Sequence, residues 1–149
     1  MVYISGPLQA AEDLQSARRL YERLARISDD RGFQPYLPHQ RTDPDKHQDV
    51  SPGEVFRTDL DALRSADLII AVVGAPSSGV GAELALAYIG RQPVIALCHE
   101  DERLSRFIEG MLADHRSALL LRYRSQQHLE QQLIRSLEQV RSELPHPVG

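Results

Sequence analysis

Apolar residues along the chain form two kinds of pattern. One is the short continuous run, seen in "MVYISGP", "DLIIAVV", "PVIALC" and "ALLLRY", which is typical of buried strands. The other is helical spacing, which predicts an amphipathic helix from about residue 10 to 31. The residues with this spacing are Leu14, Ala17, Leu20, Leu24 and Ile27.

Turn and cap residues mark the remaining elements. Ser51 suits an N-cap, Pro52 suits the first helical position and Glu54 completes a capping box, so a helix is predicted to about residue 65. The segment "FQPYLP" is predicted to be short and extended, and "HQRTDPDKHQDVSPGE" to be a surface loop. Further helices are predicted over about 80–89, over about 102–113 and through Leu129, Leu133, Leu137 and Val140.

Strands that alternate with helices predict a parallel α/β sheet with helices on both faces. Five strands suggest a Rossmann-like, flavodoxin-like layout, and 149 residues fit a single domain, 1–149. In such sheets ligands bind at the carboxyl ends of the strands. Four segments are therefore expected together: residues 6–9, the loop near His39, residues 74–81 and the segment after Cys98.

Composition narrows the classes of function. The chain is 42% hydrophobic and 26% charged with a net charge of −4, which argues against broad binding to nucleic acid or to an anionic membrane. No apolar run approaches the roughly 18 residues of a membrane span, and no signal peptide is expected, so the predicted location is cytoplasmic. Cys98 is the one cysteine and is predicted to be a core residue. The six histidines lack metal-ligand spacing and are predicted to lie mostly on the surface, so no metal or organic cofactor is expected.

The stretch "GAPSSGVGAELALAY" follows the second apolar run. Glycines allow close approach of backbone N–H groups, Ser77 and Ser78 add hydroxyls, and the start of the next helix favours an anion such as phosphate. A tight, serine-capped turn without a ligand explains the same residues. The spacing matches neither a Walker motif nor a dinucleotide fingerprint.

Carboxylates near this stretch are candidates for glycosidic chemistry. Glu83 is predicted in the first helical turn, where it either complements the helix dipole or faces the crevice as a nucleophile. Helical spacing puts Asp59 nearer the buried side than Asp61, although a solvated helix face also accounts for it. Tyr3 is either a core residue or a hydroxyl that orients a carboxylate.

Three segments together resemble the nucleoside 2-deoxyribosyltransferase superfamily: "VYISGPL", "DLDALRSADLIIAVVGAPSSGVGAELALAY" and "LSRFIEGM". The resemblance covers residues 2 to about 111 and is closer to the 2'-deoxynucleoside 5'-phosphate N-hydrolase branch. It implies a Rossmann-like sheet and cleavage of an N-glycosidic bond. It also implies roles for three residues: Glu83 as nucleophile, Asp59 in protonation of the leaving base, and Tyr3 in orienting the nucleophile.

The same resemblance implies a substrate site. Ser77 and Gly79 would hold a 5'-phosphate, with Ser105 donated by the neighbouring subunit of a homodimer. His39 resembles an active-site histidine of the family. In the first loop, Gly6 and Leu8 are expected at the substrate, whereas Gln9 stands where the phosphate hydrolases carry an arginine.

The expected function is hydrolysis of nucleoside or 2'-deoxynucleoside 5'-monophosphates to a free base and a sugar phosphate, with a small-molecule nucleotide as substrate. Two alternatives stay open. One is a deoxyribosyltransferase, in which a second base accepts the sugar. The other is a nucleotide-binding module without catalysis.

Overall fold

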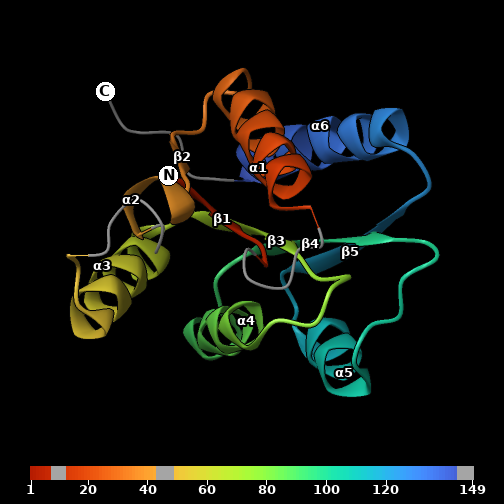
Figure 1. Ribbon diagram of the computed structural model, residues 1–149. Coiled ribbons are helices and arrows are strands. Elements are labelled where there is room, and N and C mark those ends of the chain that lie inside the picture. The colour runs from red at the N-terminus through yellow and green to blue at the C-terminus, as the bar shows by residue number, and fades with distance from the viewer. Residues whose placement is uncertain (8–12, 43–48, 144–149) are drawn as a thin grey trace.

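The computed structural model describes residues 1–7, 13–42 and 49–143. These residues form one five-stranded parallel sheet in the order β2-β1-β3-β4-β5 (Figure 1). The strands are β1 (Val2–Ser5), β2 (Pro35–Tyr36), β3 (Leu68–Val72), β4 (Val94–His99) and β5 (Ala118–Tyr123). This strand order is that of flavodoxin-like doubly wound sheets, so the predicted fold class is confirmed.

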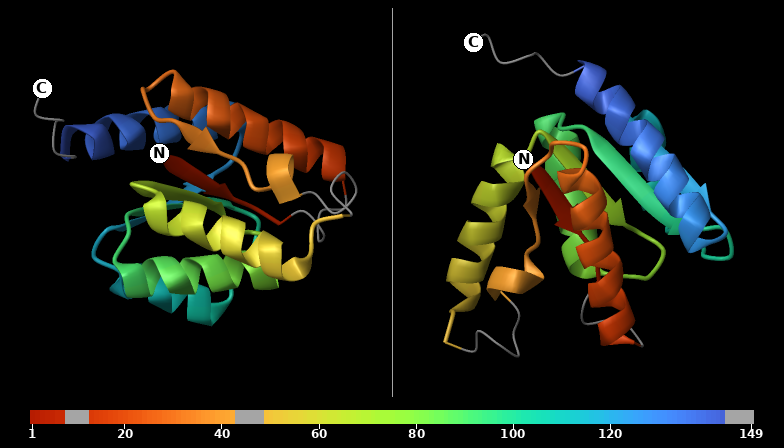
Figure 2. Two further views of the ribbon diagram at one scale, coloured as in Figure 1. Left: turned by 90° about the vertical axis from the view of Figure 1, so that its left-hand side faces the viewer. Right: turned by 90° about the horizontal axis from the view of Figure 1, so that it is seen from above.

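Helices cover both faces of the sheet, as Figures 1 and 2 show. One face carries α1 (Leu14–Asp29) and α6 (Gln126–Glu143). The other carries α3 (Pro52–Ser65), α4 (Ser78–Gly90) and α5 (Arg106–Asp114). A four-residue helix, α2 (His39–Thr42), follows β2. Each layer encloses its own apolar core, which explains why the central strands are apolar throughout.

The side chains of β1 alternate between the two faces of the sheet. Val2 and Ile4 pack in the core beneath α1 and α6. Tyr3 packs in the opposite core, beneath α3, α4 and α5. Because side chains two residues apart share a face of a strand, Ser5 lies on the same side as Tyr3.

The predicted start is correct for α3 and wrong for α5. The capping box at the start of α3 is present, with the Ser51 hydroxyl and the Glu54 carboxylate each bonded to the other's backbone N–H. By contrast, α5 begins at Arg106, four residues later than predicted. The reason is that Glu102 belongs to a turn after β4, where its N–H donates to the carbonyl of His99 at 3.1 Å.

Burial corrects part of the prediction for the histidines. His39 is only 5% exposed and tilts against the ring of Tyr21 at 5.9 Å, and the predicted surface loop begins with α2. His115 is 9% exposed; it is the C-cap of α5, and its Nδ1 accepts a hydrogen bond from the N–H of Ser117 at 3.1 Å. The prediction that Cys98 is a core residue is confirmed.

Candidate active site

The carboxylate of Glu83 reaches from α4 to the first strand of the sheet. The Tyr3 hydroxyl donates to Glu83 Oε1 at 2.7 Å, and the Ser5 hydroxyl donates to Oε2. The prediction that Glu83 lies in the first helical turn is wrong: α4 begins at Ser78, so Glu83 lies in the second turn. Dipole complementation falls off within the first turn, so it does not account for this carboxylate.

Burial and hydrogen bonding act in opposite directions on Glu83. Burial is the largest influence and raises the pKa of its carboxyl, because the charged form loses contact with water. Hydrogen bonds from Ser5 and Tyr3 oppose the rise by stabilising the ionised form, and the nearby charge of Asp59 adds to it. The pKa of Tyr3 is raised by burial and then by the charge of Glu83, so its hydroxyl stays protonated and donates.

Asp59 lies half-buried on α3, whereas Asp61 is exposed, as the helical spacing predicts. The hydroxyl of Tyr36 donates to Asp59 Oδ1 at 3.0 Å. The rings of Tyr36 and Tyr3 stack with centroids 5.4 Å apart and planes 19° apart. Stacking follows from the sheet, because these two tyrosines are register partners on β1 and β2.

Glu83 and Asp59 line one cavity of about 170 Å³ between α3 and α4. Its other lining residues are Tyr3, Phe56, Leu60, Leu63, Gly79, Ala82 and Leu86. Phe56 is 61% exposed at this cavity, so it offers an apolar face to a flat ring. The arrangement therefore combines two carboxylates suited to an electrophilic carbon with apolar walls suited to a base.

A different face of α4 borders a second cavity of about 250 Å³, lined by Ser77, Arg103 and Ser105 among others. Ser77 is the N-cap of α4, and its hydroxyl accepts from the N–H of Val80 at 3.3 Å. Ser105 precedes α5, and its side chain makes no capping hydrogen bond. The structure thus brings Ser77 and Ser105 of one chain together, but on the side of α4 away from Glu83.

Two other predicted substrate residues, Gly6 and His39, are not among the described residues that line the cavity of Glu83. Gly6 packs against a ring: a Cβ added there would lie 2.4 Å from Cε1 of Tyr21. The hydroxyl of Tyr21 donates to the carbonyl of Pro7 at 2.9 Å, which fixes the ring. His39 is not among the described residues that line the cavity, and Leu8 and Gln9 lie outside the described residues.

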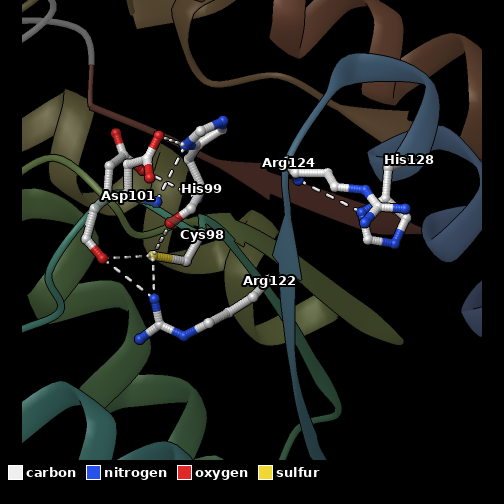
Figure 3. A network of polar contacts seen from close by, with 7 residues as sticks. Cys98, His99, Asp101, Arg122, Arg124 and His128 are labelled. Atoms are coloured by element: carbon white, nitrogen blue, oxygen red, sulfur yellow. Dashed lines mark hydrogen bonds and ion pairs between the residues drawn. The ribbon is translucent and has the colours of Figure 1, made fainter.

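The segment after Cys98 forms a polar network of its own (Figure 3). Arg122 donates to the carbonyl of Glu102 at 3.2 Å and lies 3.6 Å from Cys98 Sγ. The N–H of His99 donates to Glu102 Oε2 at 3.1 Å, and the N–H of Asp101 donates to His99 Nδ1 at 3.3 Å. These groups bind one another and add nothing to the cavity of Glu83.

Within residues 1–7, 13–42 and 49–143, no three His, Cys, Asp or Glu side chains gather as a metal ion would require. No helix in the same ranges has the length and apolar character to cross a membrane.

Sequence reasoning missed Ser5 and Tyr36. A signal for Ser5 existed, because Tyr3 and Ser5 are two residues apart on a strand and must share a face. Tyr36 could not be found in this way, because its register with Tyr3 depends on pairing of β1 and β2.

The chain matches the family model described as nucleoside 2-deoxyribosyltransferase over residues 2–141. This chain belongs to the nucleoside 2-deoxyribosyltransferase family. A family member from Thermofilum pendens, named "Putative 2'-deoxynucleoside 5'-phosphate N-hydrolase 1", is 33% identical over 113 residues, 74% of this chain and 77% of the relative. A protein of the same name from Methanosarcina mazei is 28% identical over 113 residues, 73% of this chain and 67% of the relative.

Solved structures share the fold at lower identity. The CMP N-glycosidase BcmB of Clostridium botulinum is 22% identical, with a TM-score of 0.67 over 89% of this chain and 96% of that chain. The 2-deoxyribosyltransferase of Bacillus psychrosaccharolyticus is also 22% identical, with a TM-score of 0.64 over 91% of this chain and 94% of that chain. Both have the fold of this family member.

Proposed function

We propose that this chain is an N-glycosidase that hydrolyses nucleoside 5'-monophosphates to a free base and a sugar 5-phosphate. The observation that carries the proposal is that Glu83 and Asp59 line one cavity, with Glu83 fixed by two hydroxyl donors. Retaining glycosidases use such a pair, one carboxylate as nucleophile and the other as acid. The names of the relatives from Thermofilum and Methanosarcina support the same activity.

In the proposed reaction, a Glu83 oxygen attacks C1' as the bond from C1' to the base nitrogen breaks. The electron pair of the broken bond goes to the base, which takes a proton from Asp59. Water then attacks C1' of the glycosyl-enzyme, Asp59 accepts the water proton, and Glu83 is released as a carboxylate. Burial raises the pKa of Glu83, and the hydrogen bonds from Tyr3 and Ser5 oppose that rise by favouring the ionised form, which a nucleophile requires.

The 5'-phosphate is proposed to bind at the start of α4, beside Ser77 and Gly79. Packing within the chain does not explain the glycines there: a Cβ on Gly79 would meet only Ser77 Oγ, at 3.9 Å, and one on Gly81 would meet nothing within 4 Å. A glycine inside a helix destabilises it by about 1 kcal/mol relative to alanine. Because packing does not require these glycines, the close approach of a ligand to the backbone is a reason for their presence. The N–H groups of a first helical turn favour such an anion.

A second copy of the chain is proposed to complete the site. Ile89 of α4 and Phe107 of α5 are 75% and 76% exposed beside a largely apolar groove of about 570 Å³. Exposed apolar patches of this kind mark protein interfaces. Ser105 lies directly before α5, so a partner docked on this face would bring its own serine toward the phosphate.

Base exchange is the second candidate, because the matching family model carries the name of a transferase. In that reaction the same glycosyl-enzyme forms on Glu83, but a second base attacks C1' in place of water. Adding a free acceptor base and looking for a new nucleoside or nucleotide separates the two reactions.

Chromatography of released base tests the proposed function. Ribo- and deoxyribonucleosides and their 5'-monophosphates are incubated with the wild-type protein and with Glu83→Ala. We expect base from monophosphates and none with the variant. We also expect Ser77→Ala and Ser105→Ala to raise KM for nucleotides more than for nucleosides. If no compound releases base, with or without an acceptor base, the proposed catalysis is wrong and the remaining function is nucleotide binding.

A further inference from the structure

We infer that Tyr36 is a positioning residue, which holds the carboxylate of Asp59 in the orientation for proton transfer to the leaving base. The inference rests on the proposed function, because it concerns the acid of that reaction. It adds a residue that neither the motifs of the sequence nor the names of the relatives assign.

The sheet places Tyr36 beside Tyr3, the tyrosine that donates to Glu83. Tyr3 and Tyr36 are register partners on adjacent parallel strands, and their rings stack at 5.4 Å. Each hydroxyl donates to a different carboxylate, Tyr3 to Glu83 at 2.7 Å and Tyr36 to Asp59 at 3.0 Å. Two neighbouring strands therefore each supply a tyrosine that donates to one carboxylate of the cavity.

An aspartate needs such a partner to act as a directed acid. Rotation of its carboxylate about the Cβ–Cγ bond is broad, because terminal torsions of this kind have no sharp staggered minima. A hydrogen bond to Oδ1 restricts that rotation and so fixes the direction of the other oxygen. The bond from Tyr36 has ordinary length and connects two half-buried side chains, where water competes less for the carboxylate.

Tyr36 acts through Asp59 and not on the substrate. Asp59 and Tyr3 line the cavity, whereas Tyr36 is absent from the described residues that do so. Stacking on the fully buried Tyr3 fixes the ring of Tyr36, so its hydroxyl is presented from a rigid support. Loss of the hydroxyl should therefore slow proton delivery and leave substrate binding nearly unchanged.

The test compares Tyr36→Phe with the wild-type protein, because phenylalanine keeps the stacked ring and removes only the donor. Tyr123→Phe is the matched control, since Tyr123 is another half-buried tyrosine of the sheet. Each is assayed on the best monophosphate and on analogues whose bases leave more easily, such as 5-halogenated pyrimidines or an N7-methylated purine. Asp59→Asn and the Tyr36→Phe/Asp59→Asn double variant complete a cycle.

For Tyr36→Phe we expect kcat to fall about 10- to 100-fold with KM within about 3-fold of wild type. The loss should shrink with better leaving groups, which need less protonation, and should vanish in the Asp59→Asn background. Tyr123→Phe should keep wild-type kcat.

Three results would overturn the inference: a wild-type kcat for Tyr36→Phe, a loss that is equal for all leaving groups, or the same loss when Asp59 is already replaced. These results differ from those expected if the proposed function is wrong, because the wild-type protein itself would then release or exchange no base. That outcome removes the role of Asp59 as acid and the inference with it.

Discussion

The hydrogen bond from Tyr3 to Glu83 should make a measurable contribution to the free energy of unfolding. Tyr3→Phe removes this hydroxyl from a residue that is 0% exposed and keeps its ring stacked on Tyr36. The packing is retained, so the cost is that of one hydrogen bond to a charged group, about 1.5–3 kcal/mol. For a domain of this length each kcal/mol shifts Tm by about 2–4 °C, so a fall of about 3–12 °C is expected.

The cost of Tyr3→Phe should depend on pH. A donor favours the ionised carboxylate, so its loss raises the already raised pKa of Glu83 further. At alkaline pH, above the raised pKa of Glu83, the carboxylate is ionised and the full cost applies. At about pH 4 the carboxyl is protonated and the hydrogen bond is between neutral groups, worth about 0.5–1.5 kcal/mol. The stability difference between the two proteins should therefore grow as pH rises.

Denaturant unfolding at both pH values measures this difference. Tyr88→Phe is the matched control, because the Tyr88 hydroxyl also donates to a carboxylate, that of Asp114, but both side chains are exposed. Its cost should stay below about 1 kcal/mol at either pH. A Tyr3→Phe cost that is near zero, or that is the same at both pH values, would refute the reasoning about Glu83.

Three further predictions follow from the site and its surroundings. Glu83→Gln should lower base release more than about 1,000-fold. It should also raise Tm at neutral pH: because the folded pKa of Glu83 is raised, the wild-type protein has its full stability below the ordinary pKa of a glutamate and loses stability as pH rises through the folded pKa. A variant whose stability depends on pH as steeply as that of the wild type would contradict this. Gly6→Ala should destabilise the protein by about 1–3 kcal/mol in thermal unfolding, because the new methyl group meets the fixed ring of Tyr21. Phe107→Asp should prevent the proposed dimer from forming, as measured by light scattering, and should lower activity; a wild-type monomer, or an active monomeric variant, would argue against a shared site.

Local signals in the sequence predicted most of the fold. Four apolar runs and the extended segment "FQPYLP" predicted the five strands, and the Ser51 capping box predicted the start of α3. The start of α5 was placed too early, because Glu102 is a good helix former that here serves a turn after β4. Helix propensity does not reveal this turn, whose Glu102 carbonyl also accepts a hydrogen bond from Arg122 on the neighbouring strand β5.

The candidate site was predictable only in part. Glu83, Asp59 and Tyr3 were predicted together, and the structure brings all three to one cavity. Tyr36 was out of reach because it joins the site through strand pairing. His39 packs against the ring of Tyr21 on α1, and the sequence of the loop does not reveal a contact with a helix so distant along the chain.

The central claim is that Glu83 becomes covalently bound to the sugar. The most direct measurement is intact-protein and peptide mass spectrometry after rapid acid quench, with a 2'-fluorinated nucleotide substrate that slows hydrolysis of the glycosyl-enzyme. We predict an added sugar-phosphate mass on the peptide that contains Glu83, and none in Glu83→Gln. Base release at full rate with no adduct, or an adduct on another residue, would contradict the account.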